Sequence, residues 1–288
     1  MPMKLARARV STTHVDRHNE RMTRQALEDA ARQVSEHYIP VMWNHDIRYP
    51  PLGRVISAEV VPLEDGEFAL ETMAELWEEG DPPDRLRGDG RRTLRLRTDE
   101  DHGSFIVRYD RTFLDEYGWI LIQDLAALSR ARPVEDGKKA VEPVSTLVIA
   151  AGAFALGGIA SGFFGRLGSD SYDALKRTLK RFLGEHPERQ ILVDFEMVVQ
   201  GTDRRFEVHI LLDGPTSTQI EEAFSARFGG LDETVEAIIR SVPSAARIVL
   251  EQKAGRMQIL YVVTANGVPL VTSQLNSSGT PQDRKEPS

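Results

Sequence analysis

One long run without any charged residue dominates this sequence. It spans residues 145–165 and reads STLVIAAGAFALGGIASGFFG. At about 1.5 Å rise per residue, a helix of this length would cross the roughly 30 Å hydrocarbon core of a bilayer. We therefore predict an apolar Gly/Ala-rich helix over 145–165 that spans or inserts into a membrane. Ala and Gly insert less readily than Leu or Ile, so a helix buried in a soluble core and an interfacial hairpin are the alternatives.

Small residues recur within this run at a spacing of four. Gly157, Ser161 and Gly165 form one series, and Gly158 and Gly162 form another. This spacing lets helices approach each other closely. We therefore predict a homo-oligomer that assembles through this helix.

The residues after the run, 166–185, have the pattern of an amphipathic helix. A basic helix next to an apolar span suits an anionic membrane surface and predicts that this side is cytoplasmic. We expect a membrane-associated protein with cytoplasmic domains, or otherwise a cytoplasmic one; a solvated basic face is the simpler alternative. The apolar stripe is Leu175, Leu179, Phe182 and Leu183, and the basic face is Lys176, Arg177, Lys180 and Arg181.

The rest of the chain predicts an α+β protein. In the first segment, Thr23 is a suitable N-cap for a helix that Pro40 would end, and Asp65-Gly66 is suited to a tight hairpin. The stretch GWILIQDLAAL fits either a strand or a helix. The predicted organisation is a mostly-β domain over 1–130, a polar linker over 131–144, an antiparallel ββααββ domain over 186–275 and a disordered tail over 276–288.

Charge and composition exclude several classes of function. The net charge of −8 argues against general nucleic-acid binding, which needs a concentrated basic surface. The absence of cysteine excludes disulfides, zinc–thiolate sites and thiol chemistry. No phosphate-loop, dinucleotide-binding or nucleophile-elbow motif is present, so we expect no cofactor.

Polar residues of catalytic type gather in the stretch THVDRHNERMT. His14 and His18 would lie on one face of a strand or helix, and His45 or Asp46 could add a third metal ligand. The simpler interpretation is a polar loop before a helix, and we predict no metal site. His209 alternates with apolar residues on a predicted strand, where a lone histidine is usually a hydrogen-bonded surface residue.

The first part of the chain also resembles a known family. The order VDRHNERMTRQAL, YIPVMWNHD, PLGRVISAEVV and DGEFAL over residues 10–75 resembles the N-terminal half of the tailed-phage prohead proteases, which look related to herpesvirus assemblins. The resemblance implies a protease-like fold and a bacterial or phage-derived protein. The matching residues are Asp16, Glu20, His45, Gly53, Arg54, Val55, Asp65 and Gly66.

That resemblance implies serine proteolysis, in which a histidine takes the proton from a serine. His45 would be the base, Ser104 is the serine available on a later strand, and His102 or Asp46 could orient the imidazole. The flanks of Ser104 depart from the family's pattern. We therefore predict a membrane-associated interaction or assembly protein with a protease-like but non-proteolytic domain. The alternative is a serine endopeptidase that uses His45 and Ser104 and processes itself in the stretch ARPVEDGKKAVEP.

Overall fold

The computed structural model shows an α+β chain with two sheets. It describes residues 4–16, 19, 21–77, 92–94, 96, 105–135, 144–225, 228–253 and 255–271. The chain forms two compact units, which are considered separately below. Unit 1 comprises Met1–Arg97 with Val263–Pro269, and unit 2 comprises Thr98–Val262 with Leu270–Ser288.

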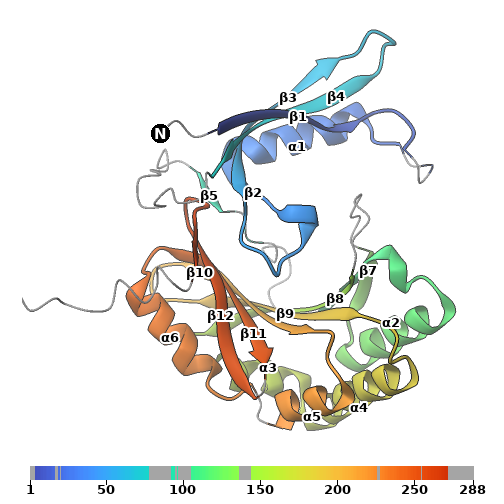
Figure 1. Cartoon of the computed structure of the whole chain (residues 1–288), viewed down its shortest axis with the longest axis vertical. Coiled ribbons are helices and arrows are strands. Elements are labelled where there is room, and N and C mark those ends of the chain that lie inside the picture. The colour runs from blue at the N-terminus through green and yellow to red at the C-terminus, as the bar shows by residue number, and fades with distance from the viewer. Residues whose placement is uncertain are drawn as a thin grey trace, which may run out of the picture. The chain divides into compact units, whose positions relative to one another are not determined.

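Unit 1 contains a five-stranded sheet with helix α1 (Arg24–Glu36) packed on it (Figure 1). Neighbouring strands pair antiparallel from β1 to β2, and β2 pairs parallel with β5. In spatial order the strands are β1 (Lys4–Thr12), β4 (Phe68–Leu76), β3 (Gly53–Pro62), β2 (His37–Val41) and β5 (Thr93–Leu94).

Helix α1 begins where the sequence predicts and ends earlier. The Thr23 hydroxyl accepts a hydrogen bond from the Ala26 N–H, as an N-cap residue does. Leu27 and Val34 are buried on one face of the helix. The helix ends at Glu36, and Pro40 lies within strand β2. Pro40 therefore does not end the helix; the chain is already extended at His37, three residues before it.

The hairpin of β3 and β4 has the turn that the sequence predicts. Gly66 has a φ of +82°, a left-handed conformation that glycine adopts without a steric penalty. At the other end of the hairpin, a Cβ on Gly53 would lie 2.1 Å from the Glu75 carbonyl oxygen. Only glycine fits at position 53 at the start of β3.

Unit 2 is built on an eight-stranded mixed sheet. Strands β9 and β10 pair antiparallel, whereas β8 with β9 and β10 with β11 pair parallel. In spatial order the strands are β13 (Pro269–Val271), β12 (Arg256–Thr264), β11 (Ala245–Lys253), β10 (Arg205–Asp213), β9 (Ile191–Gln200), β8 (Ser145–Ala155), β6 (Ile106–Tyr109) and β7 (Arg132–Glu135).

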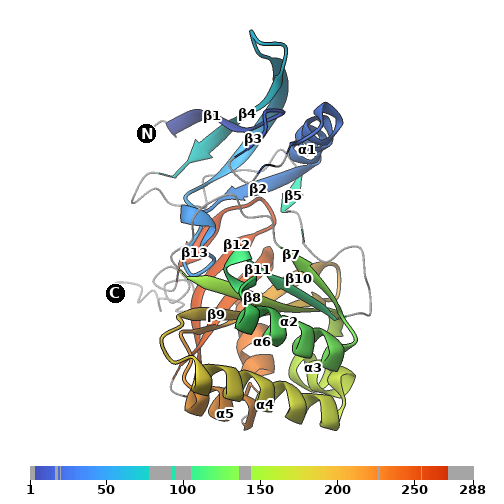
Figure 2. The same cartoon turned by 90° about the vertical axis from the view of Figure 1, so that its right-hand side faces the viewer.

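Helices cover one face of this sheet (Figures 1 and 2). Alternate side chains of β9, among them Val193, Phe195 and Met197, enter the hydrophobic core beneath the helices. Asp194 and Glu196 therefore point to the opposite face. The helices are α2 (Glu116–Ser129), α3 (Ile159–Leu167), α4 (Ser169–Glu185), α5 (Ser217–Ser225) and α6 (Leu231–Ser241).

The prediction of a membrane helix over 145–165 is wrong. The run forms strand β8, a turn at Gly157 with φ +82°, and the short helix α3. A strand paired on both sides and buried on both faces is apolar throughout, which accounts for the missing charges. Within the described part of the chain, every helix is too short or too polar to cross a bilayer. The predicted membrane association thus loses its basis.

The small residues of this run serve packing inside unit 2. A Cβ on Gly162 would lie 2.8 Å from Cδ1 of Phe154, so glycine lets α3 approach β8 closely. The four-residue spacing therefore has a use within one chain. The predicted oligomer would assemble through a helix over residues 145–165, and these residues do not form one continuous helix.

Three of the four basic side chains of α4 bind acidic side chains of the same unit. Lys176 and Lys180 both pair with Glu221 on α5, and Arg181 pairs with Asp124 on α2. These pairs fasten α4 to its two neighbouring helices. A membrane-facing surface is not needed to explain the charges, and Arg177 and Arg181 are exposed as in the simpler alternative of a solvated basic face.

The region predicted as an antiparallel ββααββ domain has the expected order of elements, but its sheet is mixed. Strands β10 and β11 run parallel because α5 and α6 carry the chain back across the sheet between them. Residues 106–109, placed in the first segment by sequence, pair with β8 and belong to the same sheet. The ambiguous stretch before residue 129 is helix α2.

Candidate functional site

His45, the predicted catalytic base, lies in the 3₁₀ helix η1 (Trp43–His45) of unit 1. Its side chain is exposed, and its φ of +59° is left-handed, as is that of Asn44 at +47°. The neighbouring Asp46 accepts a hydrogen bond from Arg48 Nη2 at 2.6 Å. Ser104 and His102 lie outside the described residues, so the His45–Ser104 pair stays a prediction.

His14, one of the histidines considered above as metal ligands, forms a hydrogen bond with an acidic side chain at the tip of the β3–β4 hairpin. Its Nε2 lies 2.6 Å from Asp65 Oδ2, and this hydrogen bond, together with the Glu67 N–H, holds the pKa of Asp65 below its usual value. His18 lies outside the described residues. Among those that are described, His14 and His45 belong to no group of three metal-ligating side chains.

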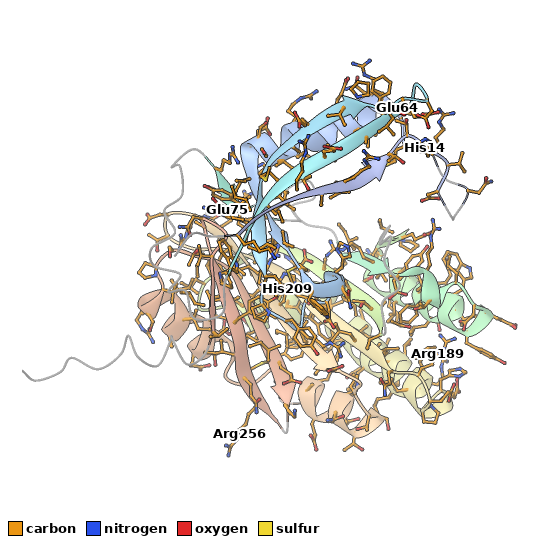
Figure 3. The ribbon with its side chains drawn as sticks, turned by 45° about the horizontal axis from the view of Figure 1, so that its top comes forward. His14, Glu64, Glu75, Arg189, His209 and Arg256 are labelled. Carbon is orange, nitrogen blue, oxygen red and sulfur yellow. The ribbon has the colours of Figure 1, made fainter. Side chains whose placement is uncertain are left out.

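A different group of titratable residues lies on unit 2 and was missed by the sequence reasoning. On the face of the sheet opposite the helices, β9 carries Asp194 and Glu196, and β10 carries His209, which is labelled in Figure 3. The antiparallel register places His209 opposite Glu196 and Leu211 opposite Asp194. All three polar side chains are buried, with His209 and Glu196 wholly inaccessible. His209 is therefore not the surface residue that the sequence predicts.

These three side chains converge. Each offers one donor atom, and the three atoms lie within 4.8 Å of one another. His209 Nδ1 is 3.0 Å from Asp194 Oδ2 and 3.2 Å from Oδ1. Two carboxylates and an imidazole are ligands that proteins use for divalent metal ions.

Further charged residues surround the three. Arg108 on β6 donates a hydrogen bond to Glu196 Oε2, and Arg247 on β11 donates one from Nε to Glu207 Oε2 at 2.7 Å. Glu207 Oε2 also lies 3.6 Å from His209 Nε2, beyond hydrogen-bonding distance. We call this set the charged face: Arg108, Asp194, Glu196, Glu207, His209 and Arg247.

Electrostatics set the protonation state of His209. Burial alone would lower its pKa, but the carboxylates of Asp194, Glu207 and Glu196 outweigh burial and raise that pKa to about 9. In the metal-free chain at neutral pH, the imidazole is thus a cation. The three cations of the charged face then balance its three carboxylates.

Two atoms of the three converging side chains are buried without a hydrogen-bond partner. They are Glu196 Oε1 and His209 Nε2. An unpaired buried polar atom costs about 1–3 kcal/mol, and more when it belongs to a charged group. The unpartnered Glu196 Oε1 in particular indicates that a further ligand completes the cluster.

The sequence contains a signal for this site. Asp194 and Glu196 are two residues apart in the otherwise apolar ILVDFEMVV, and Glu207 and His209 repeat that spacing in RFEVHILL. Residues two apart on a strand share a face. Two adjacent strands with this pattern would place four titratable groups together. Single-residue reasoning about His209 overlooked its partners.

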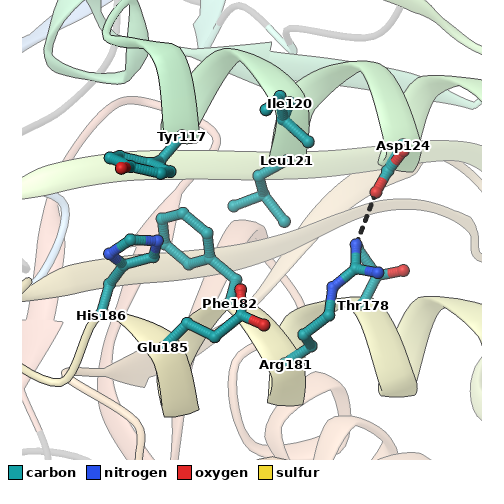
Figure 4. A pocket seen from close by; sticks show the side chains of 9 residues that line it. All are labelled: Tyr117, Ile120, Leu121, Asp124, Thr178, Arg181, Phe182, Glu185 and His186. Atoms are coloured by element: carbon teal, nitrogen blue, oxygen red, sulfur yellow. Dashed lines mark hydrogen bonds and ion pairs between the residues drawn. The ribbon is translucent and has the colours of Figure 1, made fainter.

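Unit 2 also has an apolar groove between α2 and α4 (Figure 4). Its volume is about 380 Å³, and the rings of Tyr117 and His186 lie 4.7 Å apart across it. Arg181 Nη2 pairs with Asp124 Oδ2 at 2.7 Å at its other end. On α2, the side chains of Tyr117 and Ile120 beside this groove are exposed: Tyr117 is 56% and Ile120 is 50% exposed.

Comparisons with known proteins return no relatives. No protein-family model matches the chain, and neither a curated protein nor a solved structure matches it. The resemblance to prohead proteases therefore stays a prediction.

Proposed function

We propose that unit 2 binds one divalent metal ion through Asp194, Glu196 and His209. The observation that carries this proposal is the convergence of three buried donors, within 4.8 Å of one another, together with the buried Glu196 Oε1, which lacks a partner. An ion in this position would take the place of the proton on His209.

Supporting residues stand behind two of the three ligands. Arg108 holds one oxygen of Glu196, and Glu207 stands behind the His209 ring at 3.6 Å. Metal-binding histidines usually direct their second nitrogen at such a carboxylate, which fixes the ring and raises its basicity. Arg247 in turn holds Glu207. These supporting contacts are those of a metal-binding site, whereas charges that are close by coincidence would lack them.

The burial of the ligands favours a structural role for the ion. Asp194, Glu196 and His209 are 2%, 0% and 0% exposed, so an external substrate has no direct path to them. An ion that binds the folded chain alone stabilises it in proportion to the logarithm of its concentration above Kd. We infer that the ion cross-links β9 and β10 at the centre of the sheet and so stabilises the fold.

The test is metal binding by the full chain after treatment with a chelator. We expect one Zn²⁺ per chain in equilibrium dialysis, with a rise in the melting temperature. Asp194→Asn and His209→Gln should lose this ion. His14→Gln is the matched control, because it removes an exposed histidine of unit 1. Unchanged Zn²⁺ binding by both site variants would refute the proposal.

A second candidate function is self-association, as the predicted assembly role requires. The observation that favours it is the exposed apolar surface of α2 beside the groove, formed by Tyr117 and Ile120. We propose a second copy of the chain as the partner of this surface.

Sedimentation velocity tests this second proposal. Ile120→Asp should shift the native chain toward the monomer, whereas Val10→Asp, which alters an equally exposed side chain on β1, should not. A native chain that is monomeric at every concentration contradicts self-association. The endopeptidase alternative has its own test, namely self-cleavage that Ser104→Ala abolishes.

A further inference from the structure

We propose that the ion at this site is a borderline transition ion such as Zn²⁺ or Co²⁺, and that Mg²⁺ and Ca²⁺ bind there poorly. This inference rests on the proposed function and adds the class of ion. It follows from the nature, number and support of the donors.

The first argument is the nitrogen donor. His209 Nδ1 faces Asp194 at 3.0 and 3.2 Å from its two oxygens. Bonds of about 2.0–2.1 Å at a tetrahedral angle place neighbouring donors about 3.3 Å apart. Imidazole suits zinc and its neighbours in the transition series, whereas Mg²⁺ and Ca²⁺ prefer oxygen throughout.

The second argument is the way Glu196 is held. Its Oε2 accepts a hydrogen bond from Arg108, whereas Oε1 has no partner and is the oxygen more available to an ion. Binding of an ion by both oxygens of Glu196 would compete with the Arg108 hydrogen bond. Ca²⁺ takes roughly six to eight oxygen ligands and commonly uses both oxygens of a carboxylate. Arg108 thus withholds an oxygen that Ca²⁺ would need.

The third argument is the small number of donors in a buried place. The described residues bring three donors together, and none of the three residues is more than 2% exposed. Mg²⁺ gives up its water reluctantly and usually keeps several bound molecules. Zn²⁺ is satisfied by about four ligands. A buried site with three protein donors is closer to the requirement of zinc.

Thiophilic ions are not favoured by the same donor set. The chain contains no cysteine, and the site offers two carboxylates and an imidazole. Soft ions such as Cu⁺ bind thiolate and thioether ligands instead. The donor chemistry therefore lies between that of the hard and the soft cations.

Displacement of Co²⁺ from the full chain tests the inference. Bound Co²⁺ has a visible absorption whose intensity reports its ligand number. We expect Zn²⁺ to displace it at about stoichiometric concentration and Mg²⁺ or Ca²⁺ to need at least about a hundredfold more. Displacement by Mg²⁺ or Ca²⁺ at concentrations similar to Zn²⁺ overturns the inference and leaves the metal site standing. Absence of binding by any of these ions overturns the proposed function itself.

Two variants sharpen the test. His209→Gln replaces the nitrogen ligand and should reduce Co²⁺ affinity at least about tenfold, while the control His14→Gln leaves it unchanged. Arg108→Gln frees the second oxygen of Glu196 and should narrow the difference between Zn²⁺ and Ca²⁺. An unaltered preference in Arg108→Gln contradicts the argument from Glu196. If His209→Gln does not fold, the displacement of Co²⁺ from the native chain still tests which class of ion the site prefers.

Discussion

His209 on β10 lies directly opposite Glu196 on β9, yet its Nδ1 contacts Asp194, which lies two residues before Glu196 on β9. Because of this diagonal contact, Glu196 accepts its hydrogen bond from Arg108, and Glu207 lies on the other side of the His209 ring. Each carboxylate of the charged face therefore lies at a different position around the cations. Replacement of any one of these six side chains by a neutral one leaves a buried charge without its counter-charge. The first prediction follows from this.

Glu207→Gln should destabilise the chain strongly. The substitution leaves Arg247, itself 5% exposed, without its carboxylate partner. Breaking a buried ion pair in this way costs about 3–5 kcal/mol. Glu59→Gln is the control, because Glu59 pairs with Arg7 on the surface, where a loss below about 1 kcal/mol is expected. Urea unfolding measures both; equal losses would contradict the buried role of Glu207.

Gly162→Ala and Gly165→Ala should have opposite effects, although both replace a glycine in α3. An added Cβ at 162 meets the buried Phe154 ring at 2.8 Å, so overpacking should cost about 1–3 kcal/mol. At 165 the added Cβ meets nothing within 4 Å, and alanine should stabilise the helix by up to about 1 kcal/mol. Thermal unfolding distinguishes the pair; a stabilised Gly162→Ala would show that α3 does not lie tightly on β8.

His14→Gln should raise the pKa of Asp65 toward its ordinary value. The His14 hydrogen bond and the Glu67 N–H lower that pKa in the folded chain. A carboxyl with a depressed folded pKa adds stability that is present above its unfolded pKa and is lost as pH falls through the folded one. NMR titration of the Asp65 carboxyl in the native chain and the variant measures the change. An identical titration in both would remove His14 as a cause.

Thr23→Ala should destabilise α1 by about 1 kcal/mol, because the Ala26 N–H loses the hydroxyl that caps it. Thr23→Ser keeps an oxygen at the same place and should preserve most of the stability. Chemical unfolding compares the three chains. A serine variant as unstable as the alanine variant would show that the cap is not the cause.

Elements governed by local chemistry could be predicted from the sequence. The N-cap at Thr23 and the hairpin turn at Gly66 depend on one or two residues, and both are found in the structure. The 145–165 run could not be assigned in this way, because its apolar character reflects the strands on either side of it. Burial in a sheet and burial in a bilayer select the same residues.

The candidate site illustrates the same limit. Asp194 and Glu196 are separated from His209 by a hairpin, so their meeting depends on the strand register. The i, i+2 spacing of charges in two apolar strands was visible in the sequence, but the cations that accompany them were not. Arg108 and Arg247 come from strands far along the chain, and only the order of the sheet brings them to the charged face.

The position of β8 inside the sheet has a consequence for synthesis on the ribosome. Its partner β6 precedes it, but its other partner, β9, emerges only after α3 and α4 have been translated. Until then one edge of an uncharged, β-prone strand is open to any extended chain nearby. Nascent segments of this kind are prone to aggregate and are typical clients of chaperones. In the interval between the synthesis of β8 and that of β9, the nascent chain is therefore open to aggregation through this strand.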